Sequence, residues 1–581
     1  MHAPDVAPHQ WTRIGAGEAG DAIVVAMAMG GIDHLFFTSG SEIMFFQEAI
    51  AKAQAHGRKA PKLITMTHEY ASLNAALGYA AVSGRPAATA AHVDVGTQHY
   101  GCALHTAWWA GLPILIMAGA PPVAYQGTVR GGRDGAHFWL QQTLDQNGIA
   151  RAYTKWDHRL EFQDNPGLTV SRAIQVARSE PAGPVYLSLP REIAVLQTGA
   201  SSFPACDQLA VARPSAPDPD GIKAVAQRLR TARNPYVVIS RSGKNAATVP
   251  ALVELCELLA IPVIDGGNRT YQCFPFDHWL YQGSAKLADA DMVVVLEADV
   301  PWMPSSPPPS DAYVAVIATD SIMTMIPTFE FGADIRLNSD PLNAIKVLTQ
   351  AVRDAGTPPH DLVEQRTRRW KDASAAKIKA RQQEAEAVSK KTPIDPTWLA
   401  FQVCEAMDDN CIMIDDTLSH NPLSRFLKNS RPGSYFRNPG SGGGWGPGAA
   451  LGAKLGAPDR DVVTVTGDGF YMYSEANACL SAARRYGAPY MTVVFQNRSY
   501  STGTRATAGF YPDGYSVRSG LEGGYFDPID FAKEAEAAGA YGENVREPSE
   551  VAPALQRGLA KIRSGIPAVI SVWLPRLLET T

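Results

Sequence analysis

One acid and one amide stand at the ends of two apolar runs in the C-terminal part of the chain. Asp468, in Gly467-Asp468-Gly469, directly follows the run VVTVT, and Asn497 closes the run YMTVVFQN. Each run predicts a buried parallel strand, and the stretch 474–486 between them has helical composition. Because strand ends in a strand–helix–strand unit lie side by side, the two side chains are expected to converge. Carboxylate and amide oxygens suit Mg²⁺, which keeps a water and takes diphosphate oxygens in its octahedron.

The glycines beside Asp468 favour the same site. Glycine lets backbone N–H groups approach phosphate oxygens closely. An isolated Gly-Asp-Gly is usually only a turn, and an isolated Gln-Asn pair is usually only the end of a strand. Their combination across one predicted unit favours a metal and diphosphate site over those simpler interpretations.

The composition is that of an ordinary globular protein. The chain has 581 residues and a formal net charge of −5, a length that suits about three domains. It shows no basic tract of the kind that binds nucleic acid, no apolar run of membrane-spanning length and no signal-peptide pattern. Seven scattered cysteines without a Cys-x-x-Cys pair indicate reduced thiols, so a cytoplasmic location is expected.

Strand and helix candidates alternate along the chain, which predicts an α/β protein with parallel sheets covered by helices. We expect three Rossmann-like domains, at 1–197, 219–352 and 393–581. A polar linker near 198–220 and a charged, helical stretch at 361–391 separate them, and the latter is expected to be a solvated connector. The strand candidates are DHLFFTSG, KLITMTH, AATAAHV, LPILIMAG, GPVYLSLP, PYVVIS, DMVVVLEAD, AYVAVIATD, CIMIDD, VVTVTGD, MTVVFQN and AVISVWL.

The spacing of the metal motif resembles the thiamine diphosphate signature, in which Gly-Asp-Gly is followed by about 26 residues and then Asn-Asn. Here 26 residues separate Gly469 from Gln496, and the pair reads Gln-Asn. The resemblance implies that Asp468, Asn497 and the backbone carbonyl of Ser499 hold Mg²⁺. The departure falls on Gln496, which is not the implied ligand.

A second motif lies in the N-terminal part, where Glu69 stands between a predicted strand and an Ala-rich helix. Such an acid can simply be a helix-start residue favoured by the helix dipole. The surrounding sequence, however, resembles the pyrimidine-binding domain of the acetolactate synthase and benzoylformate decarboxylase family. The resemblance implies that Glu69 contacts the aminopyrimidine ring of the cofactor from an apolar pocket. The matching stretches are His68-Glu69, Gly78-Tyr79-Ala80, Gly84-Arg85-Pro86, Val95-Gly96-Thr97, Thr154-Lys155-Trp156 and GPVYLSLPREI.

The same resemblance implies several substrate-facing groups. Ser41 matches a loop serine of the benzoylformate decarboxylases, and His92 matches a histidine that can relay protons near neutral pH. His92 and His99 can equally be ordinary polar caps at strand and helix ends. Gln141 resembles a pocket glutamine of the acetolactate synthases.

Two loops are expected to touch the cofactor. Ser419, in the sequence DDTLSH, resembles the loop at the diphosphate, where His420 can equally face substrate. The Gly-rich loop NPGSGGGWGPG is expected to contribute Gly444 and Trp445, and Phe470 joins the set beside Gly467, Asp468 and Gly469. The family places a bulky Leu or Met beneath the bend of the cofactor, but the aligned position here is Gly443. Either Trp445 or another side chain supports the bend, or the alignment shifts.

The sequence therefore predicts a homodimeric or homotetrameric enzyme that binds thiamine diphosphate and Mg²⁺ between chains, with pyrimidine-binding, central and diphosphate-binding domains. Glu69 of one chain would face Asp468 and Asn497 of the other. The expected reaction is an acetolactate-synthase-like decarboxylation or carboligation of 2-oxo acids. A lyase acting on 2-hydroxyacyl-CoA and a non-catalytic, cofactor-free relative are the alternatives. FAD is possible but not predicted, because Arg241-Ser242-Gly243-Lys244 lacks a full G-x-G-x-x-G pattern. The stretch 501–528 could form a lid.

Overall fold

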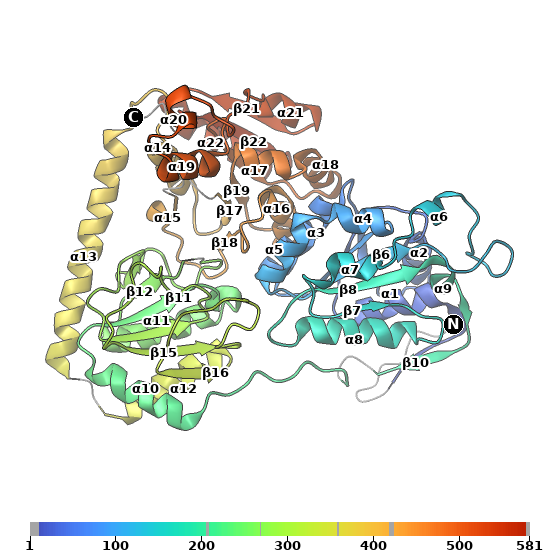
Figure 1. The fold of residues 1–581 in the computed structure, drawn as a ribbon, viewed down its shortest axis with the longest axis horizontal. Coiled ribbons are helices and arrows are strands. Elements are labelled where there is room, and N and C mark those ends of the chain that lie inside the picture. Colours follow the sequence, from blue (N-terminus) through green and yellow to red (C-terminus); the bar gives the residue numbers. More distant parts are fainter. Residues whose placement is uncertain (1–10, 205–207, 268, 357–358, 418–422, 577–581) are drawn as a thin grey trace.

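Three six-stranded parallel sheets, each flanked by helices, make up the computed structural model of the chain (Figure 1). The structure describes residues 11–204, 208–267, 269–356, 359–417 and 423–576. The sheets confirm the predicted α/β class with three parallel-sheet domains. Among the described residues, no helix is long and apolar enough to cross a membrane.

The N-terminal sheet has the strand order β4-β3-β5-β6-β8-β7. Its central strands are continuous buried runs, as a sheet covered on both faces requires. Its last strand, β7, was not predicted because it is a short polar edge strand. The strands are β3 (His34–Phe37), β4 (Lys62–Thr65), β5 (Ala87–Ala91), β6 (Ile114–Ala120), β7 (Asp157–Arg159) and β8 (Val185–Pro190).

Helices and two small antiparallel pairs complete this domain. The helices are α1 (Ala19–Met29), α2 (Phe45–Ala55), α3 (Glu69–Ser83), α4 (Asp94–His99), α5 (Cys102–Ala110), α6 (His137–Leu140), α7 (Gln146–Arg151), α8 (Pro166–Arg178) and α9 (Arg191–Ala194). The antiparallel pairs are β1 (Thr12–Ile14) with β10 (Ser201–Phe203), and β2 (Gly17–Glu18) with β9 (Gln197–Thr198).

The central sheet has the order β13-β12-β11-β14-β15-β16, which is the Rossmann strand order. Its strands are β11 (Pro235–Ile239), β12 (Val263–Asp265), β13 (Tyr281–Gly283), β14 (Met292–Leu296), β15 (Tyr313–Ala318) and β16 (Ile335–Asn338). Its helices are α10 (Pro219–Thr231), the 3₁₀ turn η1 (Ser242–Lys244), α11 (Thr248–Leu259) and α12 (Pro341–Asp354).

The C-terminal sheet, β18-β17-β19-β20-β22-β21, repeats the strand order of the N-terminal sheet. Its strands are β17 (Ile412–Asp416), β18 (Tyr435–Arg437), β19 (Val462–Gly467), β20 (Met491–Gln496), β21 (Tyr541–Val545) and β22 (Ala568–Trp573). Its helices are α14 (Pro396–Ala406), α15 (Leu423–Phe426), α16 (Trp445–Gly456), α17 (Asp468–Tyr473), α18 (Ala476–Tyr486), α19 (Ser501–Phe510), α20 (Tyr515–Ser519), α21 (Phe531–Ala537), the 3₁₀ turn η2 (Pro548–Glu550) and α22 (Val551–Arg563).

The charged connector forms one long helix, α13 (His360–Ala387), which runs along the side of the molecule from the central to the C-terminal domain (Figure 1). The expectation of a purely solvated connector is wrong, because a stripe of this helix is buried. Trp370 lies in the core, and Arg366 donates hydrogen bonds of 2.7 and 2.6 Å to the backbone carbonyls of Leu259 and Ala232.

Helices α3 and α16 join the N- and C-terminal domains by unusually close packing. A Cβ on Gly452 would lie 1.9 Å from the carbonyl oxygen of Ala75, and a Cβ on Gly78 would lie 2.0 Å from that of Ala449. Only glycine allows the two backbones to approach this closely. The contacts advance in the same direction along both helices, so the helices are parallel and their N-termini lie at the same end of the contact.

Candidate active site

Ser41 and His92 meet at the switch point of the N-terminal sheet, where the strand order reverses between β3 and β5. They contact a third residue, Glu42, which the sequence analysis did not identify. Nδ1 of His92 lies 2.5 Å from Oε2 of Glu42, and the Ser41 hydroxyl donates to Oε1 at 3.0 Å. A Cβ on Gly40 would lie 2.6 Å from the His92 ring, so glycine is needed for this loop to reach the histidine.

Glu42 and His92 stabilise each other's charged forms. Burial by itself raises the pKa of the fully buried Glu42, but the hydrogen bond and charge of His92 bring that pKa below its usual value. The hydrogen bond to Glu42 raises the pKa of His92 above its usual value, against the effect of burial. His92 therefore holds a proton to higher pH than a free imidazole does.

Gln141 joins this cluster from the end of the short helix α6. Its side chain lies close enough to His92 to add to the rise in the pKa of that histidine. The structure thus brings together Ser41, His92 and Gln141, three residues that are far apart in the sequence.

Glu69 is the first residue of α3, and its side chain is buried. Nδ1 of His99 lies 3.3 Å from Oε2 of Glu69, while the ring of His68 caps the helix by accepting a hydrogen bond from the Tyr70 N–H at 3.1 Å. A Cβ on Gly96 would lie 3.0 Å from Oε1 of Glu69, so this glycine opens space beside the acid.

Glu69 and His92 are close enough to interact electrostatically, because the charge of Glu69 contributes to the raised pKa of His92. The ligand atoms of His68, Glu69 and His99 also lie within 4.8 Å of one another. A metal ion bound by these three residues would take the carboxylate of Glu69 as a ligand, the same group that is expected to contact the cofactor ring.

Asp468 and Asn497 follow neighbouring strands of the C-terminal sheet. Strands β19 and β20 pair in parallel up to Gly467 and Phe495, so the two polar side chains emerge at the same edge. Asp468 accepts hydrogen bonds from the backbone N–H groups of Gly469 at 2.8 Å and Arg498 at 2.5 Å. No ion pair joins it to a side chain in the described part of the chain. Burial raises its pKa to about 6, although the backbone hydrogen bonds oppose the rise.

Gln496 has a structural role. Its side chain donates to the backbone carbonyl of Ile529 at 2.7 Å and accepts from the Ser571 hydroxyl at 2.6 Å. It is fully buried, away from Asn497, whose Oδ1 accepts from the N–H of Ser499 at 3.0 Å. The replacement of the first Asn of the signature by Gln496 therefore does not displace Asn497, the second amide, from the end of the strand.

A second buried acid, Asp416, ends β17, the strand next to β19. It accepts hydrogen bonds from Nδ2 of Asn438 at 2.7 Å and from the N–H of Gly446 at 2.9 Å. Burial raises the pKa of Asp416 to about 7. The neighbouring residues Ser419 and His420 lie outside the described residues, so the predicted diphosphate contact of Ser419 stays a prediction.

The Gly-rich loop leads into α16, which begins at the buried Trp445. Gly444 has a positive φ of 93°. A Cβ on Gly443 would lie 2.4 Å from the ring of Phe470, so that ring fills the space that a larger side chain would take. The Tyr70 hydroxyl, next to Glu69, donates to the carbonyl of Gly443 at 2.5 Å. The N-terminal acid and the C-terminal Gly-rich loop are therefore neighbours within one chain.

Comparison with known proteins identifies both outer domains. Residues 17–149 match the N-terminal TPP binding domain of thiamine pyrophosphate enzymes, and residues 418–572 match the C-terminal TPP binding domain. The chain therefore belongs to the thiamine pyrophosphate-dependent enzymes, a family with decarboxylase and carboligase members.

Relatives of known name are similar over long stretches. A probable acetolactate synthase of Mycobacterium bovis is 24% identical over 98% of this chain and 97% of its own length. A benzoylformate decarboxylase of Pseudomonas aeruginosa is 26% identical over 74% of this chain and 78% of its own length. The solved 4-hydroxybenzoylformate decarboxylase of Rhodococcus jostii, at 20% identity and a TM-score of 0.78, covers 96% of this chain and 99% of its own and shares the fold.

Proposed function

We propose that this enzyme uses thiamine diphosphate and Mg²⁺ to decarboxylate 2-oxo acids or to join them to a second carbonyl compound. The observation that carries the proposal is the unpaired, buried carboxylate of Asp468 beside Asn497 at two adjacent strand ends, within a TPP binding domain. The names of the relatives, acetolactate synthase and benzoylformate decarboxylase, support this reaction class.

The residues at the strand ends fit a magnesium ion. Burial raises the pKa of Asp468, which forms no ion pair with a described side chain, and a bound Mg²⁺ would stabilise its charged form. Asp468, Asn497 and the carbonyl of Ser499 would hold the ion. The backbone at Gly467, Gly469 and Gly444, which carries no side chain beyond the α-carbon, would face the diphosphate.

Thiamine diphosphate, when bound, supplies the carbon nucleophile and the electron sink. This chain would contribute proton handling around it. Glu69 would exchange a proton with the pyrimidine ring, with His99 beside it at 3.3 Å. His92, whose pKa is raised by Glu42, would donate a proton to a developing oxygen or carbon centre of the substrate. Ser41 and Gln141 would bind the oxygens of the substrate from either side of His92.

Phe470 would support the bend of the cofactor. Its ring occupies the space beside Gly443, the position at which the family resemblance implies a bulky Leu or Met. The exchange places the bulk on helix α17, which directly follows β19, instead of on the Gly-rich loop. Trp445, buried at the start of α16, would support that loop from within the helix.

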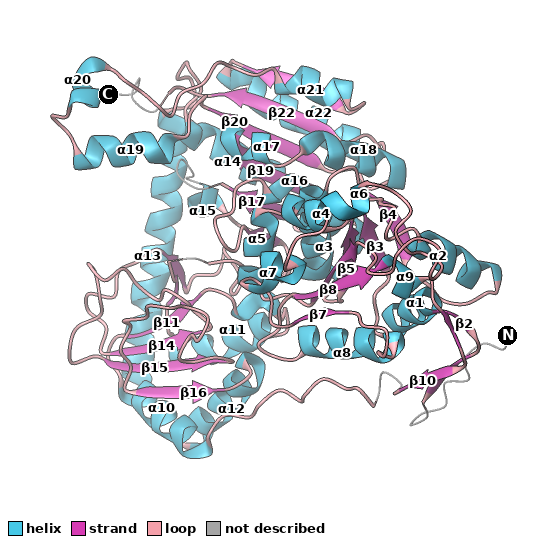
Figure 2. Ribbon diagram, turned by 45° about the vertical axis from the view of Figure 1, so that its right-hand side comes forward, coloured by secondary structure: helices cyan, strands magenta, loops and turns pink. Residues whose placement is uncertain are grey.

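A dimer would complete the site. Among the residues that the structure describes, no hydrogen bond or ion pair joins Glu69 to Asp468 or Asn497 within one chain. Helices α19 and α20 stand off the body (Figure 2), and their exposed side chains include Phe510, Tyr511, Tyr515 and Leu521. The segment 123–144 of the other domain is similarly apolar and exposed, with Tyr125, Trp139, Leu140 and Leu144. The exposed surface of segment 123–144 suits burial between two copies, whereas the weakly packed helices α19 and α20 suit a movable lid.

The direct test has two parts. First, mass spectrometry of the supernatant from denatured native protein should detect thiamine diphosphate, and CO₂ release should follow when Mg²⁺ and pyruvate or benzoylformate are added. Second, Glu69→Gln and Asp468→Ala chains, each inactive, should be mixed and allowed to exchange. If the site is shared, about a quarter of the sites regain both residues and a matching share of activity returns. No return of activity after verified exchange would contradict the shared site.

A further inference from the structure

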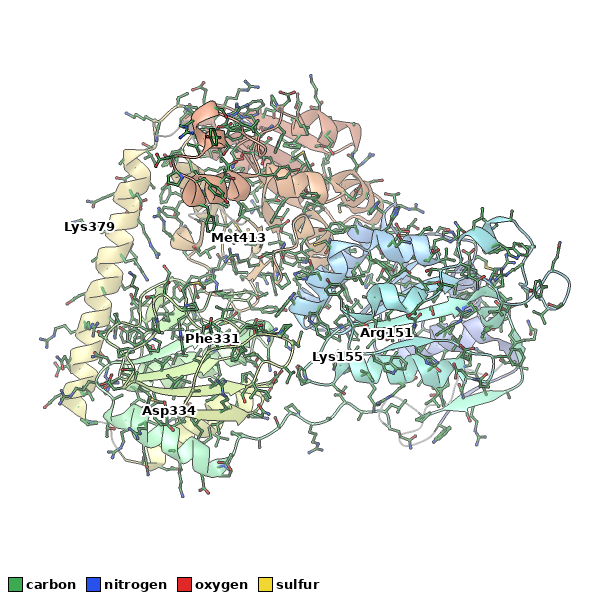
Figure 3. All side chains as sticks on the ribbon, in the orientation of Figure 1. Arg151, Lys155, Phe331, Asp334, Lys379 and Met413 are labelled. Carbon is green, nitrogen blue, oxygen red and sulfur yellow. The ribbon has the colours of Figure 1, made fainter. Side chains whose placement is uncertain are left out.

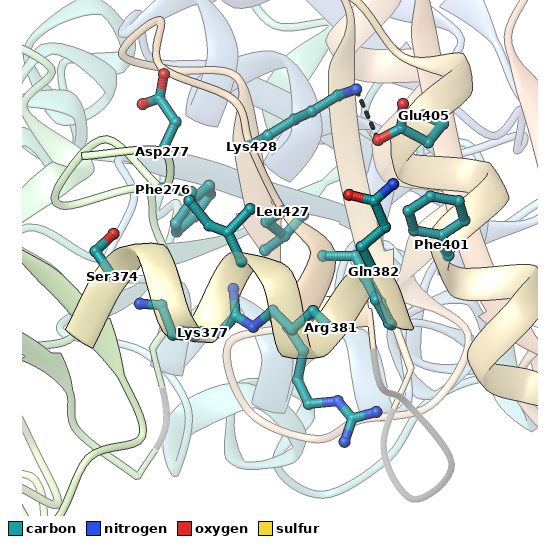
Figure 4. Close-up of a pocket in the computed structure, with 13 residues that line it drawn as sticks. Phe276, Asp277, Ser374, Lys377, Arg381, Gln382, Phe401, Glu405, Leu427 and Lys428 are labelled. Atoms are coloured by element: carbon teal, nitrogen blue, oxygen red, sulfur yellow. Dashed lines mark ion pairs between the residues drawn. The ribbon is translucent and has the colours of Figure 1, made fainter. Parts of the chain in front are cut away.

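A cavity of about 290 Å³ lies at the junction of the connector helix α13, helices α14 and α15 and the loop before β13 (Figure 4). It contains none of the residues of the candidate active site. It also lies away from the carboxyl ends of the central strands, where a Rossmann domain binds nucleotides, because its central-domain residues Phe276 and Asp277 precede β13. A volume near the lower end of the usual range for ligand pockets suits a small molecule.

Four cationic side chains and two acids, Asp277 and Glu405, line this cavity. Among the described residues, ion pairs involve two of the four cations. Arg425 pairs with Glu384 at 2.6 Å, and Lys428 pairs with Glu405 at 3.0 Å. Among the described residues, the ammonium group of Lys377 donates to the backbone carbonyl of Tyr281 and lies 5.5 Å from the centroid of that tyrosine ring, but it forms no ion pair. The guanidinium of Arg381 makes no hydrogen bond or ion pair with any residue that the structure describes.

Lys377 and Arg381 stand one helical turn apart on α13 and both face the cavity (Figure 4). Burial lowers the pKa of Lys377 to about 8, and the neighbouring charge of Arg381 adds to the effect. Burial likewise lowers the pKa of Arg381. Two half-buried cations that repel each other indicate that a negative charge is missing from the space between them.

Three phenylalanines contribute to the rest of the wall, together with Ile378 and Leu427. Phe401 and Phe426 contact each other edge to face, with ring centroids 5.6 Å apart, and Phe276 contributes a third ring. Flat apolar walls favour a flat apolar ligand, since aromatic rings pack best in offset or edge-to-face arrangements. An inorganic anion would leave these walls uncovered.

We propose that this cavity binds a small aromatic carboxylate. The carboxylate would lie between Lys377 and the guanidinium of Arg381, whose planar fork suits two carboxylate oxygens. The aromatic ring would lie among the three phenylalanines. The volume admits one aromatic ring with an acid group and excludes a dinucleotide.

Equilibrium binding to the full-length protein, without cofactor, tests this proposal. Isothermal titration with benzoate should detect a site that the double variant Lys377→Gln/Arg381→Gln weakens at least about tenfold, the loss expected when charge-assisted hydrogen bonds are removed. The matched control is Lys379→Gln, an exposed cation on the same helix, labelled in Figure 3, and its dissociation constant should stay unchanged. Acetate, which lacks the ring, should bind more weakly than benzoate.

Three results would overturn the proposal: no benzoate binding at millimolar concentration, equal binding to the wild type and the double variant, or binding of inorganic phosphate as tight as that of benzoate. If circular dichroism shows that the double variant does not fold, Arg381→Lys replaces it. That variant keeps the charge but loses the fork, so benzoate should bind several-fold more weakly, and unchanged binding would contradict the assignment. None of these measurements depends on catalysis.

Discussion

The two outer sheets have the same strand order, yet their switch points carry different charges. At the N-terminal switch point the carboxylates lie beside imidazoles, Glu42 beside His92 and Glu69 beside His99. At the C-terminal switch point the hydrogen-bond donors that the structure describes for the carboxylates of Asp416 and Asp468 are amide and backbone N–H groups, and burial raises both pKa values, to about 7 and about 6.

We infer from this difference that the N-terminal switch point handles protons and that the C-terminal switch point binds a cation. A carboxylate paired with an imidazole can hold and move a proton near neutral pH. A buried carboxylate without a cationic partner has an unfavourable charge that a metal ion can neutralise. The topology places both sites at equivalent positions, and the partners of each acid decide which chemistry that position supports.

The largest expected effect follows from removing the charge of Glu69. Glu69→Gln should lower turnover by about a hundredfold or more, in line with the usual contribution of a positioned acid or base, while thiamine diphosphate still binds. Steady-state kinetics and cofactor titration would measure the two quantities. Glu48→Gln, an exposed acid on α2, is the matched control and should keep full activity. Normal turnover of Glu69→Gln would remove this residue from the mechanism.

Asp468→Ala should abolish Mg²⁺-dependent cofactor binding, because it removes the only carboxylate among the proposed metal ligands. The loss should exceed about a hundredfold in the dissociation constant of thiamine diphosphate, or about 2.7 kcal/mol. Titration with cofactor at fixed Mg²⁺ would measure it. Gln496→Ala is the informative neighbour, since it should lower stability through loss of the Ile529 and Ser571 contacts and still bind cofactor. Cofactor binding that survives in Asp468→Ala would show that the metal lies elsewhere.

Glu42→Gln should lower kcat/KM by roughly tenfold to a hundredfold, part of what general acid–base catalysis contributes. Glu42 raises the pKa of His92, so its neutralisation should lower that pKa and move the corresponding limb of the pH–rate profile to lower pH. A loss of rate without any shift of the limb would mean that Glu42 acts only on structure. Glu48→Gln again serves as control.

Phe470→Ala should weaken thiamine diphosphate binding by about tenfold, because the cofactor loses packing against a ring that fills the space above Gly443. The double variant Phe470→Ala/Gly443→Leu restores bulk on the opposite loop and should recover part of the affinity. Direct binding measurements would test both variants. Equal affinity in all three proteins would assign support of the bend to another side chain.

The smallest expected effect concerns stability in the absence of metal. The folded-state pKa of Asp468, about 6, lies above its unfolded value, so the protonated acid favours folding below about pH 4. That contribution is lost as pH rises through about 6. In a chelator, Asp468→Asn should therefore be more stable than wild type at pH 8, by about 2 kcal/mol, and equal to it at pH 4. Urea unfolding at both pH values would measure this, and a difference independent of pH would contradict it.

Several features could be predicted from sequence because their signals are local. Continuous apolar runs predicted the buried strands, and the polar residues that end two of them predicted the neighbouring positions of Asp468 and Asn497. Glu42 could not be found in this way. Its partner His92 follows a different strand, β5, and an acid in the turn before a helix normally faces solvent.

The relation between Gly443 and Phe470 could not be predicted either. The space beside Gly443 is filled by a ring from helix α17, which is not adjacent to the Gly-rich loop in the sequence. The polar edge strand β7 lacks the apolar alternation that identifies a strand. The buried stripe of α13 could not be predicted because its sequence is dominated by charged residues, whose long aliphatic stems can pack against a core.

The glycine contact between α3 and α16 limits how this molecule can move. Hinge opening between the outer domains would have to separate two backbones that touch directly at Gly78 and Gly452, and packed interfaces of this kind do not deform gradually. Access to the site must then come from smaller parts. Helices α19 and α20 bury only Ser501 between them, so they are the described segment best able to swing on the microsecond to millisecond timescale of lids. In this enzyme, motion of these short surface segments, rather than opening between the domains, would set the rate at which substrate enters and product leaves.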